Sequence, residues 1–158
     1  MKHRDLRQKT LLSLSTFFGT GYLPLIPGTF GSCAGVLLYY FIKDNSAVFL
    51  LVTFICIVVG LFVSGRTETV LGQKDAKCIV IDEVSGMLLS LLYLPYDIKL
   101  VVIAFFLFRI LDTLKPYPAN KFQEFKGSFG VMGDDLVAGL YTNIIIQSAL
   151  RLATFRAS

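Results

Sequence analysis

Five acidic side chains interrupt otherwise apolar stretches of this 158-residue sequence: Asp82, Glu83, Asp112, Asp134 and Asp135. Carboxylates in apolar helices are costly unless they are paired or bound to a cation. Arg109 and Lys115 are too few to balance them, so a site that gathered them would keep excess negative charge. A hard divalent cation removes that excess, and Mg²⁺ typically uses one or two carboxylates, water and a substrate phosphate. The pattern therefore predicts a magnesium site.

Basic residues flank one of these acids at helical spacing. Arg109, Asp112 and Lys115 follow one another at intervals of three residues, so they share a helical face. Such a face can hold a metal ligand between two cations that bind phosphate. A structural ion pair between Arg109 and Asp112 is the simpler alternative.

A glycine-rich segment, residues 19–32, offers a second place for an anion. Glycines that lead into a helix start can present backbone N–H groups to phosphate, with Thr29 and Ser32 as hydroxyl donors. The lysine of a P-loop is missing, so nucleotide binding of that kind is excluded. A plain loop in which Ser32 caps a helix is an equally simple interpretation.

The other acids also have purely structural interpretations. Asp134 follows Gly133 and could be a helix N-cap, and Asp135 could be a favourable charge in the first turn. Asp82 and Glu83 are harder to explain in this way, because an apolar run precedes them and Val84 follows.

Several phosphatase chemistries lack their residues in this chain. The single histidine is His3, which excludes histidine nucleophiles and Ser-His-Asp triads. No cysteine is followed by arginine six positions later, and no two aspartates are separated by one residue. Water activated by a metal, or a carboxylate nucleophile in another setting, remains.

The elements that carry these residues are apolar enough for a bilayer. The composition is 54% hydrophobic and 16% charged, with a mean hydropathy of +0.67, which is extreme for a small soluble domain. Residues 47–64 carry no charge and approach the ~20 residues that cross a bilayer. Further apolar segments are residues 32–42, 79–94, 98–114 and 133–152. They predict one all-α domain over residues 1–158, a small integral membrane helical bundle with a re-entrant or broken N-terminal helix pair.

The distribution of charge predicts the topology. Suppose that residues 47–64, 79–94, 98–114 and 133–152 each cross the membrane once. Ten cations then lie on one face of the membrane: Lys2, Arg4, Arg7, Lys9, Arg66, Lys74, Lys77, Lys115, Lys121 and Lys126. Four lie on the other face: Lys43, Lys99, Arg151 and Arg156. The first face is then cytoplasmic, and all five acids lie at that side. The net charge of +4 suits anionic lipid head groups, and no pattern of a nucleic-acid binder accompanies it.

Four motifs in this order resemble the phosphatidylglycerophosphatase A family over residues 12–145. They are Leu23-Pro24 with Ile26-Pro27-Gly28-Thr29-Phe30-Gly31-Ser32, Ile79-Val80-Ile81-Asp82-Glu83-Val84-Ser85-Gly86, Phe108-Arg109-Ile110-Leu111-Asp112-Thr113-Leu114-Lys115-Pro116-Tyr117-Pro118, and Gly133-Asp134-Asp135-Leu136-Val137-Ala138-Gly139. Residues 72–76 also resemble the family, although Ala76 stands where proline often follows Asp75. The resemblance implies hydrolysis of phosphatidylglycerophosphate with Mg²⁺ in a bacterial inner membrane.

On this basis we expect Asp82, Glu83, Asp134 and Asp135 to bind the metal, with Asp112 as a further ligand or general base. Arg109, Lys115, Thr29 and Ser32 would hold the phosphate, and Glu68 and Asp75 are weaker candidates. Three rival functions stay open at this stage. They are a phosphatase of another lipid head group, a transporter or channel subunit with intramembrane acids, and a soluble helical domain with an unusually apolar core.

Overall fold

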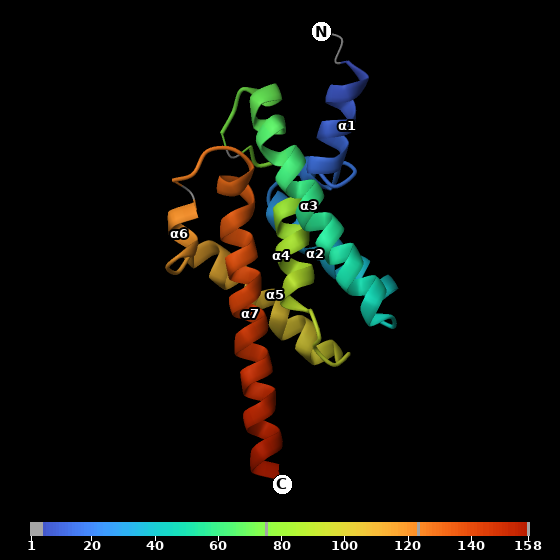
Figure 1. Cartoon of the computed structure of the whole chain (residues 1–158), viewed down its shortest axis with the longest axis vertical. Helices are drawn as coiled ribbons and strands as arrows, with labels where there is room; N and C mark the ends of the chain where they lie inside the picture. The colour runs from blue at the N-terminus through green and yellow to red at the C-terminus, as the bar shows by residue number, and fades with distance from the viewer. Residues whose placement is uncertain (1–4, 75, 123, 158) are drawn as a thin grey trace.

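The computed structural model describes residues 5–74, 76–122 and 124–157, and every regular element in these ranges is a helix (Figure 1). His3 and Asp75 lie outside the described residues. The elements are α1 (Leu6–Ser15), the 3₁₀ helix η1 (Thr20–Tyr22), α2 (Pro27–Ile42), α3 (Ser46–Leu71), α4 (Ile81–Ser90), α5 (Ile98–Leu114), α6 (Ala119–Phe122) and α7 (Ser128–Ala157). The prediction of an all-α fold is confirmed.

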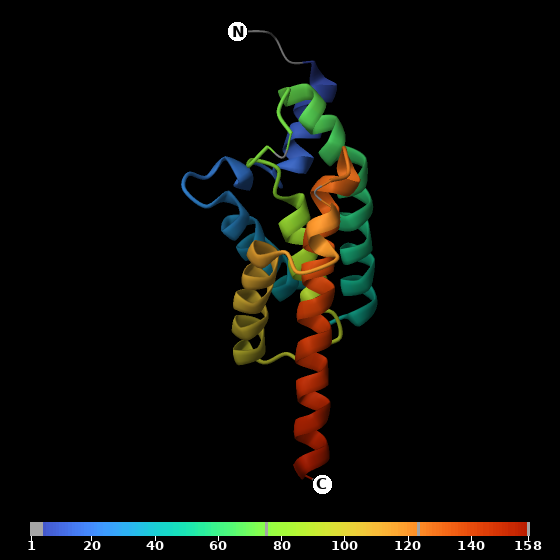
Figure 2. The same ribbon diagram turned by 90° about the vertical axis from the view of Figure 1, so that its left-hand side faces the viewer.

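Two long helices, α3 and α7, pack side by side in opposite directions (Figures 1 and 2). Both are long and apolar enough to cross a membrane. The side chain of Asn45 accepts hydrogen bonds from the N–H groups of Ala47 and Val48, which fixes the start of α3. Helix α3 ends at Leu71, and the next residue, Gly72, has the left-handed backbone (φ +67°) that terminates many helices.

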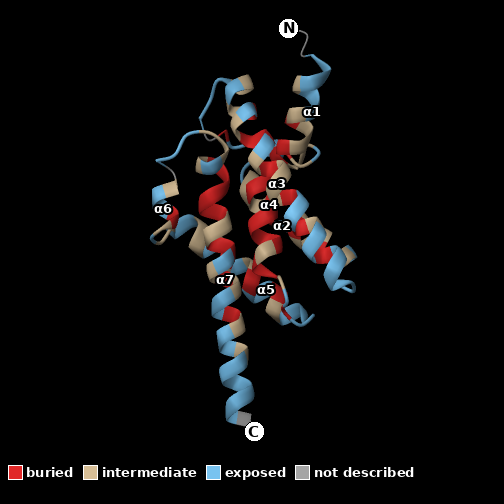
Figure 3. Cartoon of the chain, in the orientation of Figure 1, coloured by how far each residue is buried: buried red, intermediate tan, exposed pale blue. Residues whose placement is uncertain are grey.

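The central helix α4 differs from the sequence prediction. Residues 79–94 were expected to cross the bilayer, but α4 has 10 residues and rises only ~15 Å, half of the ~30 Å hydrocarbon core. Val84, Met87 and Leu88 on this helix are fully buried, and most of α4 is coloured as buried in Figure 3. An apolar run has the same sequence signature in a protein core as in lipid, and tertiary packing explains this one.

The N-terminal part of the bundle is a broken helix pair, as predicted. Helix α1 ends at Ser15, η1 follows after a short turn, and α2 begins with Pro27 in its first turn, where proline suits a helix. Helix α2 is longer than the expected half-span, residues 32–42, because it starts at this proline.

Helix α7 begins earlier than the sequence suggests. It starts at Ser128, so Asp134 lies in its second turn and is not an N-cap. The hydroxyl oxygen of Ser128 accepts a hydrogen bond from the N–H of Gly65 on α3 (2.8 Å), which ties the start of α7 to its neighbour. This tertiary contact helps the helix to continue through Gly133, which costs only ~1 kcal/mol relative to alanine.

Close packing of α4 on α7 holds two pairs of acids near each other. A Cβ atom on Gly139 would stand 2.4 Å from the carbonyl oxygen of Gly86, and one on Gly86 would stand 2.7 Å from that of Asp135. The two helices meet through glycines, as membrane helices often do. Asp82 and Glu83 on α4 therefore face Asp134 and Asp135 on α7.

Gly139→Ala is expected to destabilise the protein by ~1–3 kcal/mol, because the new methyl group overlaps the backbone of α4. The thermal unfolding temperature in detergent and the activity of the purified protein should both fall. Leu140→Ala, at the adjacent half-exposed position, should change both quantities little. An unchanged unfolding temperature for Gly139→Ala would contradict this packing.

Candidate active site

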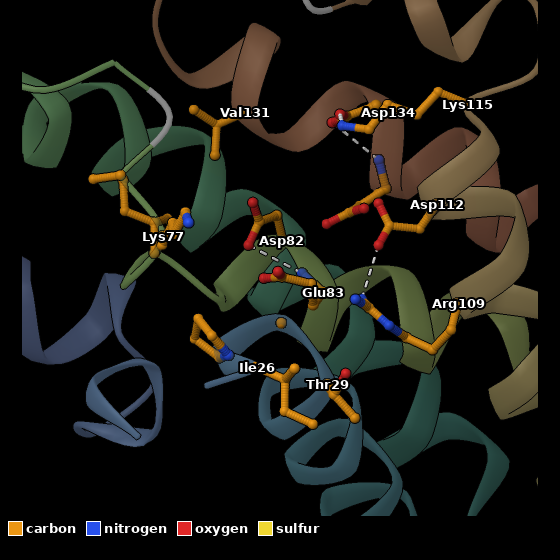
Figure 4. Close-up of a pocket in the computed structure, with 15 residues that line it drawn as sticks. Ile26, Thr29, Lys77, Asp82, Glu83, Arg109, Asp112, Lys115, Val131 and Asp134 are labelled. Carbon is orange, nitrogen blue, oxygen red and sulfur yellow. Dashed lines mark hydrogen bonds and ion pairs between the residues drawn. The ribbon is translucent and has the colours of Figure 1, made fainter. Parts of the chain in front are cut away.

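A cavity of about 290 Å³ lies where α4 and α7 begin and α5 ends (Figure 4). All five acids singled out in the sequence line it, as do Arg109, Lys115 and Thr29. The structure thus brings together residues from α2, α4, α5 and α7. Ser32 is fully buried and is not among the described residues that line the cavity.

The first turn of α4 supplies two carboxylates. The N–H of Glu83 donates to Oδ1 of Asp82 (3.0 Å), so the Asp82 side chain folds back on the helix start. Only 6% of Asp82 is exposed. The N-terminal end of a helix dipole favours negative charge, which partly offsets the burial of both acids.

Asp82, Glu83 and Asp135 form a three-carboxylate cluster, with one oxygen from each lying within 4.8 Å of the others. Oε2 of Glu83 is buried and makes no hydrogen bond within the described part of the chain. A buried carboxylate oxygen without a partner is costly, and a bound cation would satisfy it. Three hard oxygen donors at one point fit a divalent metal ion.

Asp134, predicted as a fourth metal ligand, is held differently. It forms an ion pair and a short hydrogen bond with the ammonium group of Lys115, and the cluster of three leaves it out. Burial disfavours the charged form of Lys115, but the hydrogen bond and the charge of Asp134 outweigh burial and raise its pKa. Lys115 therefore stays an ammonium cation beside the carboxylates at neutral pH.

Arg109 is fixed from two sides. Its Nη1 lies 2.8 Å from Oδ2 of Asp112, one turn along α5, and donates to the hydroxyl of Ser32 at 3.4 Å. The Ser32 hydroxyl in turn donates to the carbonyl oxygen of Gly28 (3.1 Å). Ser32 thus positions the guanidinium group and ties it to α2. The ion pair between Arg109 and Asp112, considered above as the simpler alternative, exists, and both residues also line the cavity.

The start of α2 closes the cavity from another side. Gly28 and Thr29 line it. Both lie in the first turn of α2, where backbone N–H groups have no partners within the helix. A Cβ atom on Gly28 would stand 2.5 Å from Oε1 of Glu83 and 3.2 Å from Nη2 of Arg109. Glycine lets the backbone of α2 approach both groups closely.

Gly28→Ala is expected to lower activity by about 10-fold or more, because small displacements of catalytic groups are costly. The methyl group must push Glu83 or Arg109 out of place. Alanine favours helices over glycine by ~1 kcal/mol, so the thermal unfolding temperature should not fall with the activity. Wild-type kinetics for Gly28→Ala would show that this contact does not position the site.

Sequence reasoning missed several lining residues. Lys77 was counted only as a cytoplasmic charge, but it lines the cavity on the opposite side of Asp82 and Glu83 from Arg109 (Figure 4). Its position only five residues before Asp82 in the sequence was the signal that could have placed Lys77 near the site. Ile26 and Val131 also line the cavity; Ile26 belongs to the first of the four motifs, whereas no pattern in the sequence distinguished Val131 from other apolar residues.

The comparison with known proteins agrees with this geometry. The family described as phosphatidylglycerophosphatase A matches residues 13–150. The chain belongs to the phosphatidylglycerophosphatase A family. Two relatives of that name, from Haemophilus influenzae and Escherichia coli, are each 34% identical to it. The alignments cover 92% of this chain and 94% of the first relative, and 88% and 86% for the second.

A third relative of this phosphatidylglycerophosphatase A family member carries another name. The Bacteroides thetaiotaomicron protein has the provisional name phosphatidylinositol-3-phosphatase and is 36% identical, over 86% of this chain and 91% of its own length. No solved structure matches the chain.

Membership of the family makes this chain a phosphoric monoester hydrolase, a phosphatidylglycerophosphatase by relationship. The family and the two long apolar helices together indicate a membrane protein.

Proposed function

We propose that the chain is a Mg²⁺-dependent lipid phosphatase that hydrolyses phosphatidylglycerophosphate to phosphatidylglycerol and inorganic phosphate. The observation that carries the proposal is the three-carboxylate cluster, in which one Glu83 oxygen has no hydrogen-bond partner among the described residues, in a cavity that Arg109 and Lys115 also line. The names of two relatives support the substrate.

Asp82, Glu83 and Asp135 are the proposed metal ligands, because their oxygens converge. Asp134 would act as an outer partner that orients Lys115, its ion-pair partner. When bound, Mg²⁺ would neutralise negative charge on the phosphoryl oxygens and act as a Lewis acid toward an oxygen ligand. Without a cation, three carboxylates this close would repel an incoming phosphate, so the same cluster requires a counter-charge to accept its substrate.

Cationic donors at the end of α5 and neutral donors at the start of α2 would orient the phosphate. The planar guanidinium group of Arg109 is already held in place by Asp112 and Ser32. A fixed guanidinium group suits the bidentate recognition of phosphate oxygens. Lys115 adds a point charge, and Thr29 with the free N–H groups at the start of α2 adds hydrogen bonds. Donors fixed in advance stabilise charge that grows in the transition state.

Water is the proposed attacking group, and Asp112 is the proposed acceptor of its proton. Asp112 lines the cavity beside the cluster and is held in place by Arg109, so it is an oriented carboxylate that the cluster does not use. Buried Asp82 and Asp135 are less accessible to solvent than Asp112. Attack by water forms a new P–O bond and breaks the P–O bond of the ester, and the leaving oxygen takes a proton from solvent water, so that phosphatidylglycerol leaves as the neutral alcohol and remains in the bilayer.

We place the protein in the bacterial inner membrane as a multi-pass protein, with the cavity open to the cytoplasm. Lysine and arginine residues near the end of α3 and the start of α7 (Arg66, Lys74, Lys77, Lys121 and Lys126) outnumber those at the opposite ends of these two helices (Lys43, Arg151 and Arg156), which supports this orientation. All five acids line one cavity, whereas a channel or transporter subunit would distribute its acids through the depth of the membrane. The lining therefore favours an enzyme over the transporter alternative.

A substrate panel tests the proposed specificity. Purified protein in detergent should release phosphate from phosphatidylglycerophosphate with a kcat/KM at least ~10-fold above those for phosphatidic acid, an isoprenyl phosphate and phosphatidylinositol 3-phosphate. The last lipid is included because of the name of one relative. A preference for any other lipid in the panel would overturn the substrate while leaving the site chemistry in place.

A further inference from the structure

The loop between α1 and α2 exposes large apolar side chains beside the catalytic cavity. Leu25 is 96% exposed and Phe18 is 76% exposed, and Tyr22, Leu23 and Ile26 are also exposed. Ile26 itself lines the cavity. Figure 2 shows the loop projecting sideways from the bundle, above α2 and α5. Water alone would not favour so many exposed apolar groups in one short loop.

The backbone holds this loop in an unfavourable conformation. Phe17, Phe18 and Leu25 have positive φ angles (44°, 55° and 80°), which L residues other than asparagine and aspartate rarely adopt. The inner side of the loop is fixed to the segment that leads into α4. The N–H of Val80 donates to the carbonyl oxygen of Ser15 at 2.9 Å, and Gly21 packs against the backbone of Cys78. The loop is thus anchored next to the site with its apolar side chains turned outward.

The charges around the loop suit a lipid surface. No charged residue occurs between Lys9 and Lys43, so residues 10–42 can contact lipid without burying a charge. Arg7 and Lys9 on α1 are exposed just before this uncharged stretch, where anionic head groups would pair with them. The apolar surface continues from the loop along α2, through exposed Leu37 and Phe41.

We propose that residues 17–26 form a membrane-inserted lip of the active site, with Leu25 and Phe18 among the acyl chains of the leaflet that supplies the substrate. The lip would let a lipid reach the cavity sideways from the bilayer, past Ile26, without leaving the membrane. The proposal rests on the proposed function for its substrate, but the position of the lip in the membrane is independent of catalysis.

The absence of tryptophan from the chain provides a direct test. Leu25→Trp introduces a single fluorophore into the full-length protein, reconstituted in phosphatidylglycerol-containing vesicles. Lipids with brominated acyl chains should quench this probe at least about twofold more than a probe introduced by Gln73→Trp, at an exposed position in the connection after α3. Aqueous iodide should show the opposite order. Phe18→Trp reports on the same loop if Leu25→Trp does not fold.

Two outcomes would overturn the lip. Equal quenching of the probes at positions 25 and 73 by iodide would place the loop in water. Protection from both iodide and brominated lipid would mean that protein, a second copy or a partner, covers the loop.

The Leu25→Asp variant tests whether the lip provides access for the substrate. This variant should raise KM for phosphatidylglycerophosphate in vesicles by about 10-fold, because a charge opposes insertion, and should leave kcat for a dissolved short-chain analogue unchanged. Failure of the wild-type protein to release phosphate from any lipid would refute the proposed function and leave the quenching result valid. Unchanged KM for Leu25→Asp in vesicles would refute substrate access past the lip.

Discussion

Asp82→Asn is expected to lower phosphate release by at least about 10²-fold, because several kcal/mol of metal-assisted transition-state stabilisation depend on its carboxylate. The fold should survive, since the amide oxygen of asparagine can still accept the hydrogen bond from the N–H of Glu83. Removing one of two adjacent carboxylates should also relieve repulsion between Asp82 and Glu83. We therefore expect the thermal unfolding temperature of the metal-free variant to equal or exceed that of the wild type.

Activity and stability must be measured on the same purified sample for this prediction. Asp44→Asn is the matched control, because it makes the same chemical change at an exposed side chain that contacts Lys43 and lies outside the cavity. The control should keep full activity. Wild-type turnover by a folded Asp82→Asn protein would remove Asp82 from the catalytic machinery.

Chelation of divalent metal is expected to abolish activity, and added Mg²⁺ to restore it. The physical reason is the three-carboxylate cluster of Asp82, Glu83 and Asp135, which needs a cation before an anionic phosphate can approach. Phosphate release from phosphatidylglycerophosphate should be followed with EDTA alone, and then with Mg²⁺ in excess of EDTA.

A stability measurement separates binding from catalysis in this experiment. Mg²⁺ at 100 times its Kd should stabilise the wild-type protein by ~2.7 kcal/mol, seen as a higher unfolding temperature in detergent. The shift should be much smaller for Glu83→Gln, which loses a ligand whose Oε2 has no other partner among the described residues. Full activity in a sample that elemental analysis shows to be free of metal would rule out the metal mechanism.

The gathering of the acids and cations could be predicted from the sequence because it depends on periodicity and charge. The spacing of Arg109, Asp112 and Lys115 predicted one helical face, although α5 ends at Leu114 and Lys115 follows it with a left-handed backbone (φ 47°). The common side of all five acids was predicted from four crossings, and one of these, residues 79–94, is not a spanning helix. The structure has these residues in one cavity. Their separate roles remain predictions for the variants described above.

The partners of each carboxylate were decided only by the tertiary structure. The sequence gives Asp134 and Asp135 the same local signature, yet Asp134 pairs with Lys115 while Asp135 joins Asp82 and Glu83. Adjacent residues on a helix point about 100° apart, so the packing of α4 and α5 against α7 determines which neighbour each one meets.

The composition and apolar segments by themselves predicted an all-helical protein, and the resemblance of four motifs to a known family predicted a phosphatase. Whether a given apolar helix faces lipid or protein was decided by packing alone, because burial in either surroundings favours the same residues. Helix α4 is such a case: its apolar run forms the core of the bundle and does not span the bilayer. The exposed loop at Leu25 is the reverse case, since only the tertiary structure leaves its apolar side chains without protein around them.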